Sequence, residues 1–277
     1  MRHHAPMLVL GGTGRTGRRV VQRLAALHLP VRIGSRSSGL PFDWQQPTTW
    51  QRVLADVRAA YIAYQPDIAA PGAAEEVGRF ARLAVASGVR RLVLLSRRGE
   101  PEAERAEEAL RQSGAECAVV RSARFHQNFS DGPLRDAVLA GRIVLPADHF
   151  PEPFVDADDV ADIAAAALTR DGHIGQLYEV TGPELLTLAD VAARLSEATG
   201  RRIDHESLTA QRATPALARA PEDITGLPAF PPTAALDDRN AHLTDGVRRV
   251  LGRPPRGFAD YARRAAAADI WNERRHA

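Results

Sequence analysis

A glycine-rich run near the start of the chain carries the clearest chemical signal in the sequence. The run is Gly11-Gly12-Thr13-Gly14-Arg15-Thr16-Gly17, between an apolar segment at 7–10 and an amphipathic segment at 15–28. A glycine turn that joins a strand to a helix is the setting of a dinucleotide-binding fingerprint. Of Gly11, Gly14 and Gly17, one permits the tight turn, one lets the backbone approach a pyrophosphate, and one allows close packing of helix on sheet. We therefore expect this run to bind the pyrophosphate at the amino end of the helix.

The residues that follow the second apolar segment, at 31–34, indicate which dinucleotide binds. A carboxylate at this place would hydrogen-bond the 2′-hydroxyl of the adenosine ribose and repel a 2′-phosphate. The chain instead has Ser35 and Arg36 here, and a planar guanidinium suits a phosphate because it forms two parallel hydrogen bonds. Arg15, in the glycine run, is placed to reach the same phosphate. These residues predict NADP(H) as the cofactor.

Short apolar runs alternate with helical patterns along the chain, which is typical of parallel βαβ units. The expected strands are at 7–10, 31–34, 59–63, 91–95, 118–121 and 178–180. The expected helices are at 15–28, 73–86, 102–112 and 158–168, with another that Thr187 caps and that runs to Thr199. The pattern predicts an α/β fold, a Rossmann doubly wound parallel sheet with a small C-terminal substrate-binding lobe.

The two expected domains divide near the middle of the chain. Residues 1–150, with a strand and a helix from 151–182, are expected to form the NADP-binding domain, and 183–277 mainly the substrate lobe. Residues 205–245 show no regular pattern and contain five prolines. Such a segment suits a substrate-side lobe or lid better than another βαβ unit.

The charged residues exclude several classes of protein. The chain has 277 residues with 36 basic and 34 acidic side chains, and because it contains no lysine every basic one is an arginine. Schiff-base enzymes, phosphate loops that need a lysine and tyrosine–lysine dehydrogenase pairs are therefore excluded. The arginines are scattered among carboxylates, whereas nucleic-acid binders concentrate them in stripes with aromatic residues. We therefore expect no nucleic-acid partner. We also expect no membrane partner, because no apolar run approaches the ~18 residues that span a bilayer.

Other catalytic and compartment signals are weak or missing. Cys117 is the only cysteine and the nine histidines lack metal-ligand spacing, so we expect neither a disulfide nor a metal site. Asp158 or Asp159 is expected to cap the helix that follows. The chain has no Gly-x-Ser-x-Gly elbow, which argues against a hydrolase. Its first residues lack the apolar core of a signal peptide, so we expect a cytoplasmic monomer or homodimer.

Taken with the cofactor motifs, several further stretches resemble a known family. The chain is similar to the NmrA-like group of atypical short-chain dehydrogenases/reductases, and within it to the ergot-alkaloid-type agroclavine (festuclavine) dehydrogenases and their bacterial relatives. The stretches that carry the resemblance are 11–17, 34–36, 41–44, 47–50, 89–96, 125–129, 154–161, 243–247 and 252–255. The glycine turn is common to many families, whereas Asp43-Trp44 and Phe125–Phe129 are more specific.

The resemblance implies NADPH-linked chemistry on a small organic molecule. It places Asp43 and Trp44 near the adenine, and Tyr64 and Gln65 along the cofactor. It also places Ser96 beside the nicotinamide. Asn128 and its neighbours would line the cleft between nicotinamide and substrate, and the substrate-binding residues expected there are Arg124, Phe125, His126 and Asn128. Arg124 would suit an acidic or phenolic substrate.

The proton donor is the open question. Typical members of the wider superfamily use a tyrosine helped by a lysine four residues later, and no tyrosine of this chain has a basic residue at that distance. The remaining candidates for a proton or a hydrogen bond are Tyr64, Ser96, His126 and Asn128. His126 attracts attention because the ordinary pKa of histidine suits acid–base work near neutrality.

Three functions fit these residues. The first is NADPH-dependent reduction of an imine, enone, quinone or ketone of specialised metabolism, in which hydride geometry does most of the work. The second is a non-catalytic NADP(H) sensor or regulator, which the missing tyrosine–lysine pair favours. The third is a redox-neutral cyclase or isomerase that retains the cofactor. The sequence favours the first, because the proline-rich segment at 205–245 suits a substrate pocket.

Overall fold

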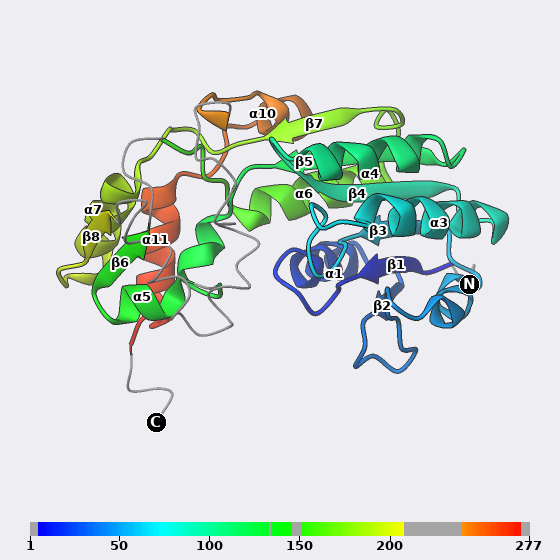
Figure 1. Ribbon diagram of the computed structural model, residues 1–277, viewed down its shortest axis with the longest axis horizontal. Helices are drawn as coiled ribbons and strands as arrows, with labels where there is room; N and C mark the ends of the chain where they lie inside the picture. Colours follow the sequence, from blue (N-terminus) through cyan, green and yellow to red (C-terminus); the bar gives the residue numbers. More distant parts are fainter. Residues whose placement is uncertain (1–4, 133, 146–150, 208–239, 273–277) are drawn as a thin grey trace. The chain divides into compact units, whose positions relative to one another are not determined.

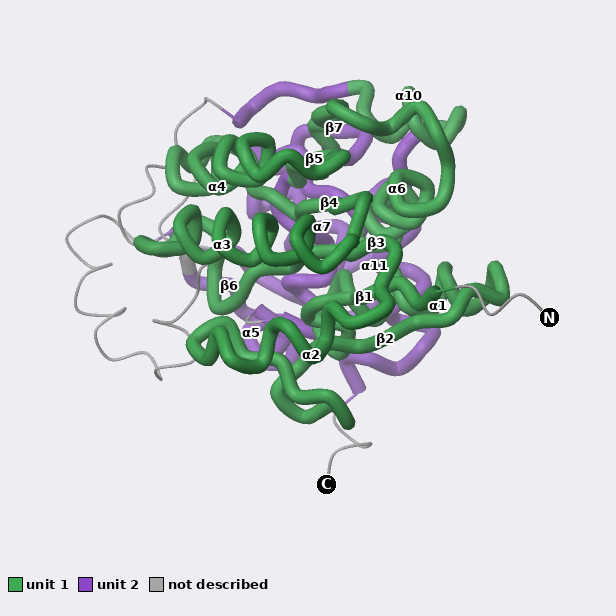
Figure 2. Tube along the Cα trace, turned by 90° about the vertical axis from the view of Figure 1, so that its right-hand side faces the viewer, with its two compact units in different colours: residues 1–122, 157–180, 245–253 green, residues 123–156, 181–244, 254–277 purple. Residues whose placement is uncertain are grey.

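The computed structural model describes residues 5–132, 134–145, 151–207 and 240–272. The chain divides into two compact units, which Figure 2 colours separately. Unit 1 comprises residues 1–122, 157–180 and 245–253, and unit 2 comprises residues 123–156, 181–244 and 254–277. The chain first passes from unit 1 to unit 2 after Ser122, whereas the sequence predicts that the first domain extends to residue 150.

Unit 1 contains a six-stranded parallel sheet in the order β2-β1-β3-β4-β5-β7 (Figure 1). The strands are β1 Met7–Leu10, β2 Val31–Gly34, β3 Ala59–Ile62, β4 Arg91–Arg97, β5 Glu116–Ser122 and β7 Leu177–Val180. All six match segments predicted from the sequence, and the doubly wound Rossmann sheet is confirmed. The strand order reverses between β1 and β3, and open α/β sheets bind ligands beyond the carboxyl ends of their strands at such a switch point.

Helices cover both faces of this sheet (Figure 2). On one face lie α3 Ala73–Ala86 and α4 Pro101–Arg111, and on the other lie α1 Gly17–Ala26 and α6 Ala157–Thr169. The shorter elements of unit 1 are η1 Pro47–Thr49, α2 Trp50–Leu54 and α10 Gly246–Leu251. The apolar stripe of α3 packs Val77, Phe80 and Ala84 into a core with the strand residues Leu92 and Leu94. Burial of that stripe stabilises the helix more than its intrinsic propensity does.

The predicted capping role of Asp158 or Asp159 is wrong. Because α6 begins at Ala157, both carboxylates lie inside its first turn rather than before it. Asp158 accepts a 2.5 Å hydrogen bond from Arg23 of α1. Asp159, which has no exposed surface, accepts a 2.7 Å hydrogen bond from Arg253. Both carboxylates therefore bind arginines from positions inside the first turn of α6.

Unit 2 is built from short elements around an aromatic core. They are η2 His126–Phe129, α5 Arg135–Leu139, β6 Arg142–Leu145, α7 Leu188–Thr199, β8 Asp204–Ser207 and α11 Phe258–Ala267. The core includes Phe129, Phe154 and Phe258, and Trp271 donates its indole N–H to the Phe129 carbonyl at 2.7 Å. Strands β6 and β8 pair in parallel, so residues 205–207 are regular where the sequence predicts an irregular segment. The five prolines of that segment fall within 208–239, outside the described residues.

The predicted cap of α7 is confirmed. The Thr187 hydroxyl accepts from the backbone N–H of Asp190 at 3.1 Å, and the Asp190 carboxylate accepts from the backbone N–H of Thr187 at 2.9 Å. This reciprocal capping box satisfies two N–H groups at the start of the helix. No helix in the described part of the chain is long and apolar enough to cross a membrane.

Candidate functional site

The glycine run forms a tight turn between the end of β1 at Leu10 and the start of α1 at Gly17. Gly11 has a φ of +66°, a left-handed backbone that glycine adopts without steric cost. A Cβ atom on Gly17 would lie 2.1 Å from the carbonyl oxygen of Gly11, so only glycine fits there. The N–H of Gly14 donates to the same carbonyl at 2.8 Å and closes the turn. The result is a cradle of main chain at the amino end of a helix, which fits a pyrophosphate.

The other polar residues of the turn differ in exposure. Thr13 is exposed and Arg15 is half-buried. Thr16 is 5% exposed, and its hydroxyl accepts a 3.0 Å hydrogen bond from the fully buried Tyr61 of β3. Thr16 therefore fastens the start of α1 to the sheet, while Thr13 and Arg15 keep more access to a ligand.

A loop at 35–41 follows β2 beside the glycine turn. Leu10 pairs with Gly34 in the sheet, and the N–H of Gly11 donates to the Gly34 carbonyl at 3.0 Å. Arg36 is exposed in this loop, which contains no carboxylate. A guanidinium thus stands in the loop where a carboxylate would otherwise select a ribose with a free 2′-hydroxyl.

Asp43 and Trp44 lie just beyond this loop. The Asp43 carboxylate accepts a 3.0 Å hydrogen bond from the N–H of Gln45, and the Asp43 carbonyl accepts one of 2.8 Å from the Trp50 indole. Trp44 is 6% exposed and packs against Tyr64 with ring centroids 4.7 Å apart. Trp44 is therefore a member of the unit 1 core and lies beside a residue that follows β3.

Tyr64 and Gln65 follow β3 at the switch point. The Tyr64 hydroxyl donates a 2.8 Å hydrogen bond to Glu76 of α3, and burial together with this carboxylate raises the pKa of Tyr64. The phenol therefore keeps its proton and directs it to Glu76. Gln65 is exposed, and its amide nitrogen would lie 3.8 Å from a Cβ atom on Gly14, so it lies beside the glycine turn.

Ser96 lies near the end of β4, but its hydroxyl is already occupied. The side chain is 1% exposed and donates a 2.5 Å hydrogen bond to Glu107 of α4. The Glu107 carboxylate has no exposed surface and accepts two hydrogen bonds from Arg121 of β5, at 2.9 and 2.6 Å. The Glu107 hydrogen bond raises the pKa of Arg121 more than burial lowers it. This pair anchors α4 to the carboxyl ends of β4 and β5.

His126 lies in unit 2, at the start of η2, with no exposed surface. Its Nε2 lies 3.0 Å from the Phe154 carbonyl, which fixes the proton on this nitrogen, and its Nδ1 lies 4.0 Å from Asp156. Burial lowers the pKa of His126 to about 4, against the opposing effect of Asp156. The neutral imidazole therefore dominates near pH 7. The ordinary pKa of histidine, which makes His126 a candidate acid in the sequence, does not apply to this buried side chain.

The Asp156 carboxylate organises the surroundings of this histidine. One of its oxygens accepts a 2.8 Å hydrogen bond from Gln127, and the other accepts one of 2.8 Å from Arg264 of α11. The imidazole also packs edge-on against Phe258, with centroids 5.1 Å apart. His126 is thus surrounded by ring contacts and a paired carboxylate.

The other predicted substrate residues lie on the same segment. Phe125 forms a bridge with Val155, and Arg124 Nε lies 3.6 Å from a Glu152 carboxylate oxygen. Asn128 is 2% exposed, and its carbonyl accepts the N–H of Leu134 at 3.0 Å. Arg124, Phe125, His126 and Asn128 are therefore held close together within unit 2.

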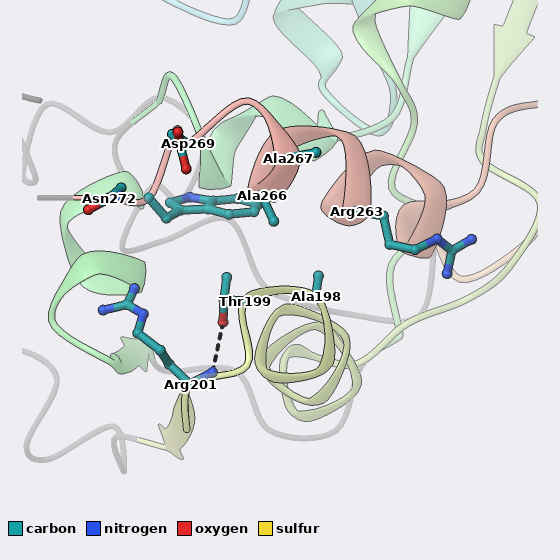
Figure 3. A pocket seen from close by; sticks show the side chains of 9 residues that line it. Ala198, Thr199, Arg201, Arg263, Ala266, Ala267, Asp269 and Asn272 are labelled. Carbon is teal, nitrogen blue, oxygen red and sulfur yellow. Dashed lines mark hydrogen bonds between the residues drawn. The ribbon is translucent and has the colours of Figure 1, made fainter.

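Unit 2 also has an open pocket of about 700 Å³ between the carboxyl ends of α7 and α11 (Figure 3). Trp271 and Arg201 lie on its walls, and the Thr199 hydroxyl accepts from the N–H of Arg201 at 3.4 Å. None of the predicted substrate residues lines this pocket.

Individual relatives cover nearly the whole chain, although no protein-family model matches it. The chain is 32% identical to the uncharacterized oxidoreductase YesF of Bacillus subtilis, over 96% of each protein. It is 30% identical to festuclavine dehydrogenase of Aspergillus fumigatus, over 94% of this chain and 98% of that one. It is 30% identical to the NAD(P)H azoreductase of Xenophilus azovorans, over 95% of this chain and 98% of that one.

The chain belongs to the NmrA-like family of atypical short-chain dehydrogenases/reductases. The fold agrees with that of the Citrobacter sp. triphenylmethane reductase in complex with NADP(H), at a TM-score of 0.74 and 20% identity over 94% of this chain and 99% of that one. In this NmrA-like protein the glycine turn lies beside the loop at 35–41 and beside Gln65, all within unit 1.

Glu107 is not among the residues predicted from the sequence, although the sequence contains a signal for it. The buried face of α4 consists of Ala103, Ala106, Glu107 and Leu110, at the spacing of one helical stripe. A carboxylate on an otherwise apolar stripe indicates a buried partner of opposite charge. The hydroxyl of Ser38, which closes the loop after β2, has no comparable signal in the sequence.

Proposed function

We propose that this NmrA-like protein is an NADPH-dependent reductase of a small organic molecule with an imine, enone, quinone or ketone. One observation supports the cofactor preference above the others. The loop after β2 joins the glycine turn at Gly34 and has the exposed Arg36 in place of a carboxylate. An arginine at this place binds a 2′-phosphate and leaves a cofactor without that phosphate at a disadvantage.

The residues that would hold the cofactor all belong to unit 1. The main chain of Gly11 to Gly17 would hold the pyrophosphate, and Ser35, Arg36 and Arg15 the 2′-phosphate. Asp43 and Trp44 would lie toward the adenine, and Tyr64, Gln65 and Ser96 along the rest of the molecule. When bound, NADPH supplies a hydride to an electrophilic carbon.

The environments of the candidate proton donors favour a substrate that does not need an acidic proton from the protein. The Tyr64 proton is directed to Glu76 and the Ser96 proton to Glu107. His126 is neutral near pH 7 because burial lowers its pKa to about 4. Asn128 can donate a hydrogen bond from its amide but has no acidic proton.

This arrangement favours substrates that are electrophilic before they bind. An iminium ion becomes an amine when it accepts a hydride and needs no proton, and a quinone or an enone can take its proton from solvent afterwards. Correct placement of the reacting carbon then accounts for most of the rate enhancement. The proposed role of Arg124, Phe125, His126 and Asn128 is to position the substrate, with Asn128 as a hydrogen-bond donor.

The test is a turnover assay that follows cofactor and product together. Purified protein is mixed with NADPH and a panel of cyclic imines, enones, quinones and ketones, while absorbance reports NADPH and mass spectrometry reports the product. We expect NADPH loss to match a product that has gained two hydrogen atoms. We also expect NADH to support a rate at least about tenfold lower.

Two outcomes would contradict the proposal. Product formation without NADPH loss would identify a redox-neutral cyclase or isomerase. Tight NADPH binding without turnover of any compound in the panel would indicate a sensor.

A further inference from the structure

The loop that carries Arg36 is anchored in the core at both ends. Gly34, before it, is buried at the end of β2. Phe42, after it, is 3% exposed and packs edge-on against Trp44 with centroids 5.0 Å apart. The Phe42 N–H returns to the Ser35 carbonyl at 3.0 Å. Both ends of the loop are therefore fixed in the core of unit 1.

The tip is a four-residue turn from Ser35 to Ser38. The N–H of Ser38 donates to the Ser35 carbonyl at 3.3 Å, the hydrogen bond between first and fourth residues that many β-turns have. Arg36 and Ser37 occupy the two central positions of this turn and are exposed. The direction in which the guanidinium leaves the chain therefore depends on the geometry of this turn.

The side chain of Ser38 closes the turn from inside. Its Oγ accepts from the N–H of Ser35 at 3.2 Å, and lies 2.9 Å from the Ser35 carbonyl and 2.6 Å from the Leu40 carbonyl. A serine hydroxyl has one proton and two acceptor positions. All three contacts are with the loop's own backbone. Ser38 would therefore affect ligand binding by holding the conformation of the turn.

We propose that Ser38 is a positioning residue for cofactor choice, which holds the turn that presents Arg36 to the 2′-phosphate of NADP(H). The inference rests on the proposed phosphate site at Arg36. A loop that is already in its binding conformation loses less conformational entropy when the ligand binds. Without the Ser38 hydroxyl the tip would sample other conformations, and the loss would fall on the phosphate contact alone.

The experiment measures the Kd of NADPH and of NADH by calorimetric titration for Ser38→Ala, Arg36→Ala and the double variant. We expect Ser38→Ala to weaken NADPH about tenfold and NADH less than about twofold, the size of one lost hydrogen bond. Arg36→Ala should weaken NADPH more strongly. In the double variant the Kd of NADPH should equal that of Arg36→Ala within about twofold, because Ser38 acts through Arg36.

Two further variants control for indirect effects. Ser38→Thr keeps the hydroxyl and should restore NADPH affinity to within about threefold of wild type. Ser113→Ala removes a hydroxyl that donates to the Leu110 carbonyl at 2.6 Å and accepts from the Ala115 N–H at 3.3 Å, a similar arrangement elsewhere in unit 1. Its affinity for both cofactors should remain that of the wild type.

The outcomes separate this inference from the site on which it rests. If Arg36→Ala leaves NADPH affinity unchanged, the phosphate site is misplaced and the role of Ser38 falls with it. If Arg36→Ala weakens NADPH but Ser38→Ala does not, only the inference about Ser38 is wrong. Equal losses for both cofactors in Ser38→Ala, or fully additive losses in the double variant, would also overturn it.

Discussion

The hydroxyl of Ser96 donates a 2.5 Å hydrogen bond to Glu107, a carboxylate with no exposed surface. Arg121 binds both oxygens of the same carboxylate from the neighbouring strand. Loss of one partner of such a carboxylate leaves a buried charge uncompensated and destabilises the folded protein strongly.

Replacement of Glu107 by Gln should therefore destabilise the protein strongly. The amide cannot match both donors of Arg121, and we expect a loss of about 3 kcal/mol in the free energy of unfolding. Urea denaturation measures it. The matched control is Glu108→Gln on the same helix, where the carboxylate is exposed and accepts from Arg111; its midpoint should not move. Similar midpoints for both variants would contradict the role assigned to Glu107.

Replacement of Gly17 by Ala should prevent normal folding of the turn. The added methyl group would meet the Gly11 carbonyl at 2.1 Å, and backbone cannot move aside as a flexible side chain can. We expect a loss of about 3 kcal/mol in the free energy of unfolding and a large loss of NADPH binding, measured by thermal unfolding and titration. Gly39→Ala is the control for stability, since a Cβ atom there meets nothing within 4 Å. If the Gly17→Ala protein is as stable as the Gly39→Ala protein, the turn accommodates a Cβ atom at position 17 and the prediction is wrong.

The sheet could be predicted because its strands are apolar and its helices have a clear 3.6-residue stripe. Strand β8 could not, because Asp204–Ser207 contains no apolar side chain, and in the described part of the chain β6 pairs with this strand alone. The cofactor turn was found because glycine has few substitutes at such positions.

The environment of the candidate acids is less accessible to sequence reasoning. A histidine after a strand looks the same in sequence whether it is exposed or buried, and the ordinary pKa was the only guide to His126. Burial, the Phe154 carbonyl and Asp156 decide its chemistry, and each depends on tertiary packing. For the same reason Ser96 could be placed at the end of its strand, but its hydrogen bond to Glu107 could not be foreseen.

Replacement of Arg36 by Asp should reverse the cofactor preference. The new carboxylate repels a 2′-phosphate and can bind a free ribose hydroxyl, so we expect NADPH to bind about 100-fold more weakly and NADH to change less than about threefold. Titration with both cofactors measures this. Arg52→Asp makes the same charge change at an exposed position of α2 and should have little effect. Equal losses for NADPH and NADH in Arg36→Asp would place the phosphate elsewhere.

His126 should make the protein sensitive to acid. Its pKa is about 4 in the folded protein and about 6.5 in the unfolded chain. The unfolded chain therefore binds more protons between these values, and stability that is fully present above pH 6.5 is lost as the pH falls toward 4. The full contribution of His126 to the free energy of unfolding is on the order of 3 kcal/mol.

Urea unfolding at a series of pH values tests this expectation. The wild type should lose stability steadily between pH 6.5 and 4.5, and His126→Asn, although less stable at pH 7, should show a flatter dependence. Identical slopes in the two proteins would mean that other groups cause the acid sensitivity. The groups that face the imidazole in unit 2 are Asp156 and, through it, Arg264, so both proteins must keep these residues.

Three carboxylates with no exposed surface, Glu107, Asp156 and Asp159, each bind an arginine: Arg121, Arg264 and Arg253. A guanidinium keeps its proton far into the alkaline range, whereas the ammonium of a lysine in the same place would begin to lose its own near pH 10. Alkaline solution therefore leaves the cations of these buried pairs intact. We expect the protein to tolerate high pH far better than low pH, a practical guide for its storage and for the choice of assay buffers.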